Sequence, residues 1–558
     1  MRVGLITIIL FLNSLLIWGQ TNSGTDALYK HFVYFKDKAN NAFTIQQPQQ
    51  FLSAKAIQRR ERYQIPVNTR DLPVSSGYVT QLKQAGAKVW YSSRWFNGAL
   101  IQCDTSTFRK IKKLPFIKTA ETVALRSKKS NQSGGQQYTA RMDSESTPQP
   151  RGQKQVVFGE AYPQAKLIGV PEMHAAGFRG QGMSIAVFDG GFAGVNRISA
   201  FNHLFSNNKI KATFDFVDKN TGVYEKDSHG TEVLSTIAAN VPNVFVGTAP
   251  QAEYSLFITE DVSREQRLEE VNWLLAAEFA DSMGVDIIQT SLGYNFFDGA
   301  NNSYTYPDMN GDKAISTRAA DFAAATGILV VVSAGNEGND PWQYITAPAD
   351  ADSVLSIGAT DSLGRRAVFS SIGPTYDKRI KPEIAGQGLL AAVINPAGNV
   401  IKANGTSFSA PIICGLAAGF WQANRELTNL QVMDYLKLSG SQAAHPDNSL
   451  GFGIPNFTRA QILADQLEGD LNGSSKLFPN PVTDNHFTVL MPVSADQNTE
   501  IHLFNAVGQE VSTFSYHYNQ IKSDRTFITF ELNGLAPGIY HCVITGINRS
   551  ETIRFLKL

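Results

Sequence analysis

From Ile168 to about residue 468, the hydrophobic pattern alternates between two kinds of segment. Short runs of consecutive apolar residues are typical of strands buried on both faces, and longer stretches with apolar positions three and four residues apart are typical of helices. This alternation predicts an α/β unit, a parallel sheet with helices on both faces, whose functional residues gather at the carboxyl ends of the strands. The predicted strands are 185–188, 252–258, 285–290, 328–332 and 354–357, and the main helices are 264–283 and 314–326.

The pattern differs on either side of this unit. Residues 28–128 mix strand-like and helical stretches and predict a small α+β unit, with strands at 31–35 and 89–91 and helices near 54–63 and 79–85. Residues 477–558 contain short alternating strands separated by Gly, Pro and Asn, which predicts a small all-β sandwich. Its predicted strands are 486–490, 500–504, 526–532 and 539–544.

The remaining segments predict how the chain is divided. An apolar run at 3–18 after Arg2 indicates a secretory signal peptide, with an uncleaved anchor as the less favoured alternative. Residues 126–155 are rich in Ser, Gln, Gly and Lys and cannot bury enough surface to fold, so we expect an exposed linker that proteases can cut. The expected divisions are 1–19, 20–155, 156–468 and 472–558.

Composition excludes several classes of protein. The 558 residues carry a formal net charge of +0, so nothing indicates a nucleic-acid partner. Hydrophobic content of 43% and charged content of 18% describe a folded protein. The three cysteines, Cys103, Cys414 and Cys542, fall in three different predicted units, so neither a disulfide framework nor a zinc site follows.

Candidate chemistry begins at Ser407, in the stretch Asn-Gly-Thr-Ser-Phe-Ser-Ala-Pro at 404–411, directly before the apolar segment 412–421. A serine nucleophile needs a base and a fixed position, and a helix N-terminus supplies the position. Its free amide and positive dipole end can also stabilise an oxyanion. The alternative is that Thr406 or Ser407 only caps a buried helix.

Three further stretches carry the side chains that a serine nucleophile needs. Asp189 directly follows the predicted strand 185–188 and precedes two glycines, where an orienting carboxylate belongs. His229 lies in Asp-Ser-His-Gly-Thr-Glu at the start of a helical pattern, and Asn336 lies between glycines after the strand 328–332. The amide of Asn336 is a suitable oxyanion donor.

The order Asp189, His229, Asn336, Ser407 and the motifs around these residues resemble the subtilase family. The matching stretches are 186–191, 229–231, 291–293, 334–336 and 405–411, within roughly 165–460. The departures are Phe188, where an aliphatic residue is commoner, and Gly190-Gly191, where many members carry Thr-Gly. The resemblance implies a subtilisin-like serine endopeptidase with Asp189, His229 and Ser407 as its catalytic triad, Asn336 in its oxyanion hole, and a substrate-binding surface formed by Ser291, Leu292, Gly293, Ala334 and Gly335.

The flanking units carry resemblances of their own. A small unit and a cleavable linker before a protease resemble the propeptide of secreted subtilases, the alternative being a permanent accessory domain. The stretches 477–482, 535–540 and 554–558 resemble the C-terminal sorting domains of type IX secretion cargo. The alternative there is a carbohydrate- or protein-binding module of the same fold. We therefore expect export through the periplasm to the surface or the medium, with protein and peptide substrates and the secretion machinery as partners.

No cofactor is required by this chemistry, and we expect a monomer. Residues 308–312, Asp-Met-Asn-Gly-Asp, have oxygen donors at alternate positions, as calcium loops do. Ala320 occupies the place of the acidic residue that closes an EF-hand, so a solvated turn is favoured over calcium.

Other classes of function fit less well. His229 is not followed by the second histidine of a helical zinc motif, and Ser409 replaces the second glycine that an α/β-hydrolase carries around its nucleophile. The non-enzyme alternative is an adhesin or binding scaffold on an inactive protease fold at the cell surface. Such a protein would normally have lost a catalytic residue, and none is missing here.

Overall fold

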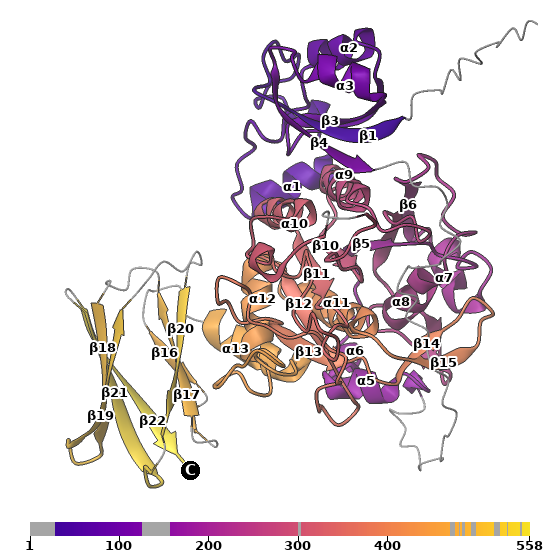
Figure 1. The fold of residues 1–558 in the computed structure, drawn as a ribbon. Coiled ribbons are helices and arrows are strands. Elements are labelled where there is room, and N and C mark those ends of the chain that lie inside the picture. Colours follow the sequence, from indigo (N-terminus) through magenta and orange to yellow (C-terminus); the bar gives the residue numbers. More distant parts are fainter. Residues whose placement is uncertain are drawn as a thin grey trace, which may run out of the picture.

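The computed structural model describes residues 28–124, 157–299, 303–468 and most of 475–558. The predicted signal peptide and nearly all of the predicted linker lie outside the described residues. Three folded units follow one another along the chain (Figure 1). None of the helices in the described ranges combines the length and apolarity that a membrane crossing needs.

The central unit is built on a seven-stranded sheet whose neighbouring strands are all parallel. The α/β prediction is therefore confirmed. The strands lie in the order β13-β12-β11-β10-β5-β9-β6. Their bounds are β5 (Ser184–Asp189), β6 (Ile210–Asp215), β9 (Glu253–Ile258), β10 (Ile287–Thr290), β11 (Leu329–Ser333), β12 (Leu355–Thr360) and β13 (Ile384–Gln387).

Helices cover both faces of this sheet because alternate strand residues point to opposite sides. Along β5, Ile185 and Val187 join a core with α8 (His229–Ala238) and α11 (Thr406–Ala423). Ala186 and Phe188 face the other way, toward α9 (Leu268–Met283) and α10 (Ile315–Ala325). Further elements complete the unit, namely α5 (Tyr162–Leu167), α6 (Val170–Ala175), α7 (Asn202–Ser206), α12 (Asn429–Leu438), α13 (Phe457–Glu468), β7 (Asn240–Val241), β8 (Phe245–Val246), β14 (Ala391–Ile394) and β15 (Val400–Ala403).

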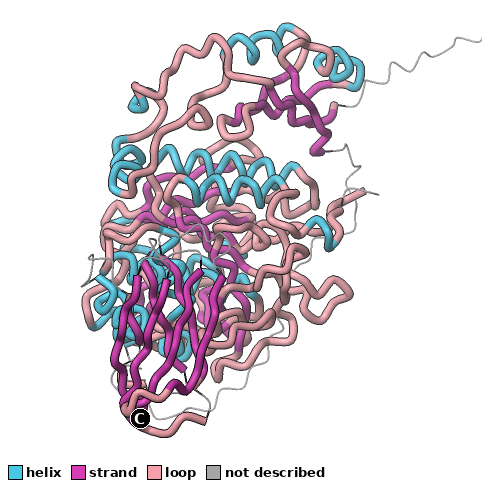
Figure 2. The backbone as a smooth tube through the Cα atoms, turned by 90° about the vertical axis from the view of Figure 1, so that its left-hand side faces the viewer, coloured by secondary structure: helices cyan, strands magenta, loops and turns pink. Residues whose placement is uncertain are grey.

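The N-terminal unit is an antiparallel sheet of order β2-β3-β1-β4 that packs on the central unit (Figures 1 and 2). One face, with Phe32 and Leu100, shares a core with α9 and α10. The other face, with Val33 and Ile101, is covered by α2 and α3. Its elements are β1 (Tyr29–Phe35), α1 (Ala54–Arg62), α2 (Ser76–Gln84), β2 (Lys88–Ser93), β3 (Gly98–Cys103), α3 (Thr105–Ile111) and β4 (Ile117–Ala124).

The C-terminal unit consists of two antiparallel sheets, β16-β17-β20 and β19-β18-β21-β22, packed around their own hydrophobic core. This arrangement confirms the predicted all-β sandwich, which lies away from the N-terminal unit in both views (Figures 1 and 2). Its strands are β16 (Lys476–Phe478), β17 (His486–Pro492), β18 (Asn498–Asn505), β19 (Glu510–His517), β20 (Arg525–Glu531), β21 (Gly538–Gly546) and β22 (Arg549–Lys557).

The sequence pattern missed the two edge strands of the central sheet. β6 interrupts its apolar positions with Lys211 and Thr213, and β13 has only four residues, one of them Gly386. β6 is partly exposed and needs less apolar surface, whereas β13 is buried but too short to form a recognisable apolar run.

Candidate active site

Asp189 and His229 meet at the carboxyl edge of the sheet. Asp189 is the last residue of β5 and is 1% exposed, and its two carboxylate oxygens lie 3.0 and 3.1 Å from Nδ1 of His229. The backbone N–H of Gly190 also donates to the Asp189 carboxylate, at 2.8 Å. Because the aspartate holds Nδ1, the other ring nitrogen is free to exchange a proton with a third group.

Two glycines allow α8 to begin this close to β5. A Cβ on Gly230 would lie 2.3 Å from the carbonyl oxygen of Gly191 and 2.9 Å from Cβ of Asp189. A Cβ on Gly191 would lie 2.4 Å from the backbone nitrogen of Asp227. The glycines in both predicted motifs are therefore needed for the approach of the helix to the strand.

The electrostatic environment of His229 favours the imidazolium. Burial by itself lowers the pKa of His229, but the carboxylates of Asp189, Asp227 and Glu232 outweigh it and raise the pKa above its ordinary value of 6.5. Asp227 also accepts a hydrogen bond from the backbone N–H of His229, at 2.8 Å. Nε2 of His229 is buried and has no hydrogen-bond partner within the described part of the chain.

Ser407 is the second residue of α11 and is 3% exposed. The first N–H groups of a helix have no intrahelical acceptor, so the amide of Ser407 is available to an oxyanion. The Ser407 hydroxyl donates to the carbonyl oxygen of Ser291 at 3.4 Å, and the Ser291 hydroxyl donates to the carbonyl oxygen of Ser407 at 2.8 Å. The ring of Phe408 lies 6.0 Å from that of His229, so α11 and α8 bring Ser407 and His229 to the same edge.

Asn336 is oriented by Thr406. Its Oδ1 accepts hydrogen bonds from the backbone N–H of Thr406 at 2.8 Å and from the Thr406 hydroxyl at 2.9 Å. Because both donors occupy the oxygen, the amide must direct its Nδ2 elsewhere. The sequence suggested Thr406 only as a possible helix cap, although its position directly before the candidate nucleophile was a usable signal.

The predicted substrate-binding residues form two adjacent segments. Ser291, Leu292 and Gly293 directly follow β10, while Ala334 and Gly335 directly follow its parallel neighbour β11. The backbones of Leu292 and Gly293 make no hydrogen bond within the described ranges, and Gly293 is exposed. This segment therefore offers an open edge to which an extended peptide could add as a strand.

A third segment at this edge was missed in the sequence. The loop 259–267 follows β9, which lies beside β5, and the backbone N–H of Thr259 donates to the carbonyl oxygen of Asp189 at 3.1 Å. Val262 is 56% exposed, and a Cβ on Gly190 would lie 2.7 Å from its side chain. The position of this loop after a predicted strand was the available signal, because parallel strands end at one edge.

Two of the oxygen-bearing side chains in residues 308–312 accept hydrogen bonds from neighbouring residues. The Asp308 carboxylate accepts from the backbone N–H and the hydroxyl of Thr305, and the Asn310 side chain accepts from the backbone N–H of Asp312. No group of three or more His, Cys, Asp or Glu side chains is arranged to hold a metal ion in the ranges that the structure describes.

A parallel sheet covered by helices, with aspartate, histidine and serine at its carboxyl edge, is the arrangement of serine hydrolases with an α/β fold. Within that class, the chain belongs to the subtilase family. Residues 180–453 match the model of the Subtilase family. A subtilisin of Bacillus pumilus is 31% identical over 291 residues, which cover 51% of this chain and 92% of the relative. Subtilisin NAT of Bacillus subtilis subsp. natto is 28% identical over 377 residues, covering 67% and 82% of the two chains.

The solved structure of the MycP3 protease from the type VII (ESX-3) secretion system is 23% identical, with a TM-score of 0.44 over 54% of this chain and 88% of that one. The flanking units match their own families. Residues 30–138 match the Peptidase S8 propeptide domain of Bacteroidota, and residues 476–557 match the Secretion system C-terminal sorting domain. The chain is thus a secreted or cell-surface subtilase with a propeptide.

Proposed function

We propose that this subtilase is an active endopeptidase in which Ser407 attacks the peptide carbonyl carbon and His229 Nε2 takes the hydroxyl proton. Asp189 holds the imidazole through Nδ1 and stabilises its positive charge. Asn336 Nδ2 and the Ser407 amide stabilise the oxyanion. His229 then protonates the leaving amine, and a water molecule activated by the same imidazole hydrolyses the acyl-enzyme.

The observation that carries this proposal is the hydrogen bonding of the two ring nitrogens of His229. Nδ1 is held by the Asp189 carboxylate at 3.0 Å, while the buried Nε2 has no partner within the described ranges, on the edge where α11 presents Ser407. Burying an unpaired ring nitrogen costs free energy, and His31 and His203 bear the same cost, but among the described residues only His229 combines it with a carboxylate on its other ring nitrogen. The arrangement therefore favours an enzyme over an adhesin.

The flanking units indicate how the enzyme would mature and be exported. The chain would be made as a precursor, exported through the periplasm and released or displayed by the type IX machinery that reads residues 476–557. Cleavage within the predicted linker 126–155 would separate the propeptide from the peptidase unit. Each proton in the catalytic cycle stays on Ser407, His229, water or the leaving amine, so the proposed chemistry uses no cofactor.

The Ser407→Ala chain, expressed without other proteases, tests the proposal. We expect it to accumulate as uncut precursor and to leave casein intact, because both cleavages need the nucleophile. Ser409→Ala is the matched control, since its hydroxyl belongs to the same helix but only donates to the carbonyl oxygen of Thr406, at 3.1 Å. Processing or casein hydrolysis by Ser407→Ala at the rate of the control would refute the proposal.

A further inference from the structure

The N-terminal unit carries an arm, residues 36–75, which connects β1 to α2 and includes α1. The arm leaves the antiparallel sheet and places α1 at the C-terminal ends of α9 and α10 (Figure 1). Backbone carbonyls without intrahelical partners and the negative ends of the helix dipoles lie there. This end of the two helices therefore attracts cations and donors.

Arginines of the arm meet this end of the peptidase unit. Arg59 donates to the carbonyl oxygens of Thr326 and Val285 and to the carboxylate of Asp281. Arg60 makes two bonds of 3.0 Å to the two oxygens of Asp281. The backbone N–H of Ser53 donates to the carbonyl oxygen of Ser282 at 2.9 Å.

A second segment of the propeptide adds a third guanidinium. Arg94, in the turn between β2 and β3, donates to the Asp281 carboxylate at 2.5 Å. The neighbouring Glu278 carboxylate accepts from the Ser93 hydroxyl at 2.5 Å and from the backbone N–H groups of Arg94 and Trp95 at 3.0 and 3.1 Å. The propeptide thus satisfies both carboxylates that α9 presents on this face.

Asp281 is fully buried by these contacts, at 0% exposure. Burial by itself raises the pKa of Asp281, but Arg94, Arg60 and Arg59 outweigh it and lower the pKa to about 2. The charged pairing would therefore persist in mildly acidic solution. Gly284 follows the last residue of α9 and has a φ of +80°. It also allows α1 to approach closely, because a Cβ on Gly284 would lie 2.6 Å from the backbone nitrogen of Ala56.

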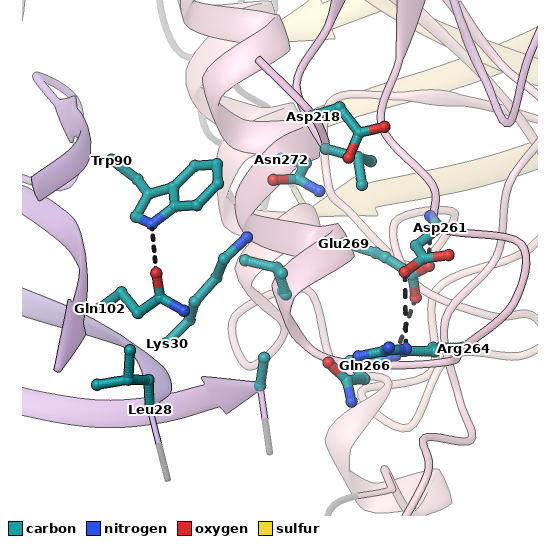
Figure 3. A pocket seen from close by; sticks show the side chains of 13 residues that line it. Leu28, Lys30, Trp90, Gln102, Asp218, Asp261, Arg264, Gln266, Glu269 and Asn272 are labelled. Atoms are coloured by element: carbon teal, nitrogen blue, oxygen red, sulfur yellow. Dashed lines mark hydrogen bonds and ion pairs between the residues drawn. The ribbon is translucent and has the colours of Figure 1, made fainter. Parts of the chain in front are cut away.

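The seam on the side of loop 259–267 is different. A cavity of about 540 Å³ separates the ends of β1 and β4 from this loop (Figure 3). Lys30 extends toward this cavity with its Nζ 4.0 Å from the centroid of the Trp90 ring, and Asp218 and Asp261 line the opposite side. Beside the cavity, this side of the seam is crossed by a hydrogen bond from Lys219 Nζ to the carbonyl oxygen of Trp90 at 2.5 Å and by a partly exposed ion pair of Arg267 and Glu121 at 3.7 Å.

We infer that Asp281 is the centre of a docking surface that holds the propeptide on the peptidase unit after the linker has been cut. The inference rests on the proposed removal of the propeptide, and the partner is the excised propeptide of this chain, bound through its arm. A partner without matching guanidinium groups would leave the Asp281 carboxylate buried and unpaired, so the surface selects its own propeptide.

The test measures binding in the Ser407→Ala chain, so its outcome does not depend on catalysis. A recognition sequence for a site-specific protease replaces part of 130–150, the chain is immobilised through a C-terminal tag and cut, and loss of the propeptide is followed over time. We expect slow loss from the parent chain and loss about 10²- to 10³-fold faster with Asp281→Asn. Lys55→Ala is the control, because its pair with Glu253, at 3.8 Å, is a partly exposed surface pair on the same helix α1.

A second variant, Arg59→Met, alters the arm and leaves the peptidase unit unchanged, and it should release the propeptide faster in the same way. Cooperative thermal unfolding before the cut identifies variants that have folded. Loss rates for Asp281→Asn and Arg59→Met within about threefold of the parent, or a Lys55→Ala rate as high as theirs, would overturn the inference.

Discussion

Thr406, the residue before Ser407, donates both its backbone N–H and its hydroxyl to Oδ1 of Asn336, at 2.8 and 2.9 Å. The helix that carries the candidate nucleophile thereby also orients the candidate oxyanion donor. The same hydroxyl lies 3.1 Å from the carbonyl oxygen of Gly335, in the second substrate-binding segment. One side chain thus couples three parts of the proposed site.

Replacing Thr406 with Val removes the hydroxyl bond and retains the backbone bond to Asn336. We expect kcat to fall about 3- to 10-fold with little change in KM, because one neutral hydrogen bond orients a donor that acts on the transition state. Asn336→Ala should cost more, about 10²- to 10³-fold in kcat, the loss known for the equivalent donor of a subtilisin. Steady-state kinetics on one peptide substrate gives both values, and a Thr406→Val effect confined to KM would contradict the orienting role.

The pH dependence of activity should reflect the carboxylates around His229. His229 must be neutral to act as a base, and because its pKa is raised it loses its proton only at higher pH. We therefore expect kcat/KM to rise with pH through a midpoint above 6.5. Asp227→Asn can still accept the backbone N–H of His229 but removes a negative charge, which lowers the pKa of His229. The midpoint should therefore move to lower pH, and an unchanged or higher midpoint on an uncharged substrate would contradict this account.

Removing the C-terminal unit separates sorting from substrate binding. The sandwich has its own core, and all proposed catalytic residues lie before it, so a chain ending at Glu468 should cleave small peptides at the full rate. We expect this chain to remain in the periplasm of its native host, which fractionation and assay of each compartment would detect. Export to the medium with activity lost only on large proteins would instead indicate a substrate-binding module.

Much of the fold was predictable because buried parallel strands have a strong local signal. β5, which ends at Asp189, and β11, which precedes Asn336, are rich in apolar residues, and each is followed by a glycine-containing turn. The edge strands β6 and β13 were not found, because β6 is partly exposed and carries polar residues, while β13 is buried but has only four residues, one of them glycine. The local sequence pattern therefore identifies a strand best when the strand is both buried and long enough to form an apolar run.

Contacts between distant parts of the chain could not be predicted in this way. Nothing local to Arg59 indicates that it reaches Asp281, which is more than 200 residues away, because that contact depends on how two folded units dock. The orientation of Asn336 by Thr406 likewise depends on α11 beginning beside the segment that follows β11. The motifs identified the candidate residues, whereas the groups that orient these residues could be identified only from the structure.

The central claim is that Ser407 is a nucleophile activated by His229, and covalent labelling tests it most directly. The mature enzyme is treated with a fluorophosphonate, and the modified peptide is located by mass spectrometry. The account predicts one adduct, on Ser407, strongly slowed labelling of His229→Ala, and no adduct at that site in Ser407→Ala. Turnover by Ser407→Ala should fall by about 10⁶-fold, as it does when a subtilisin loses its nucleophile. An adduct on a different residue, or hydrolysis by Ser407→Ala near the wild-type rate, would contradict the account.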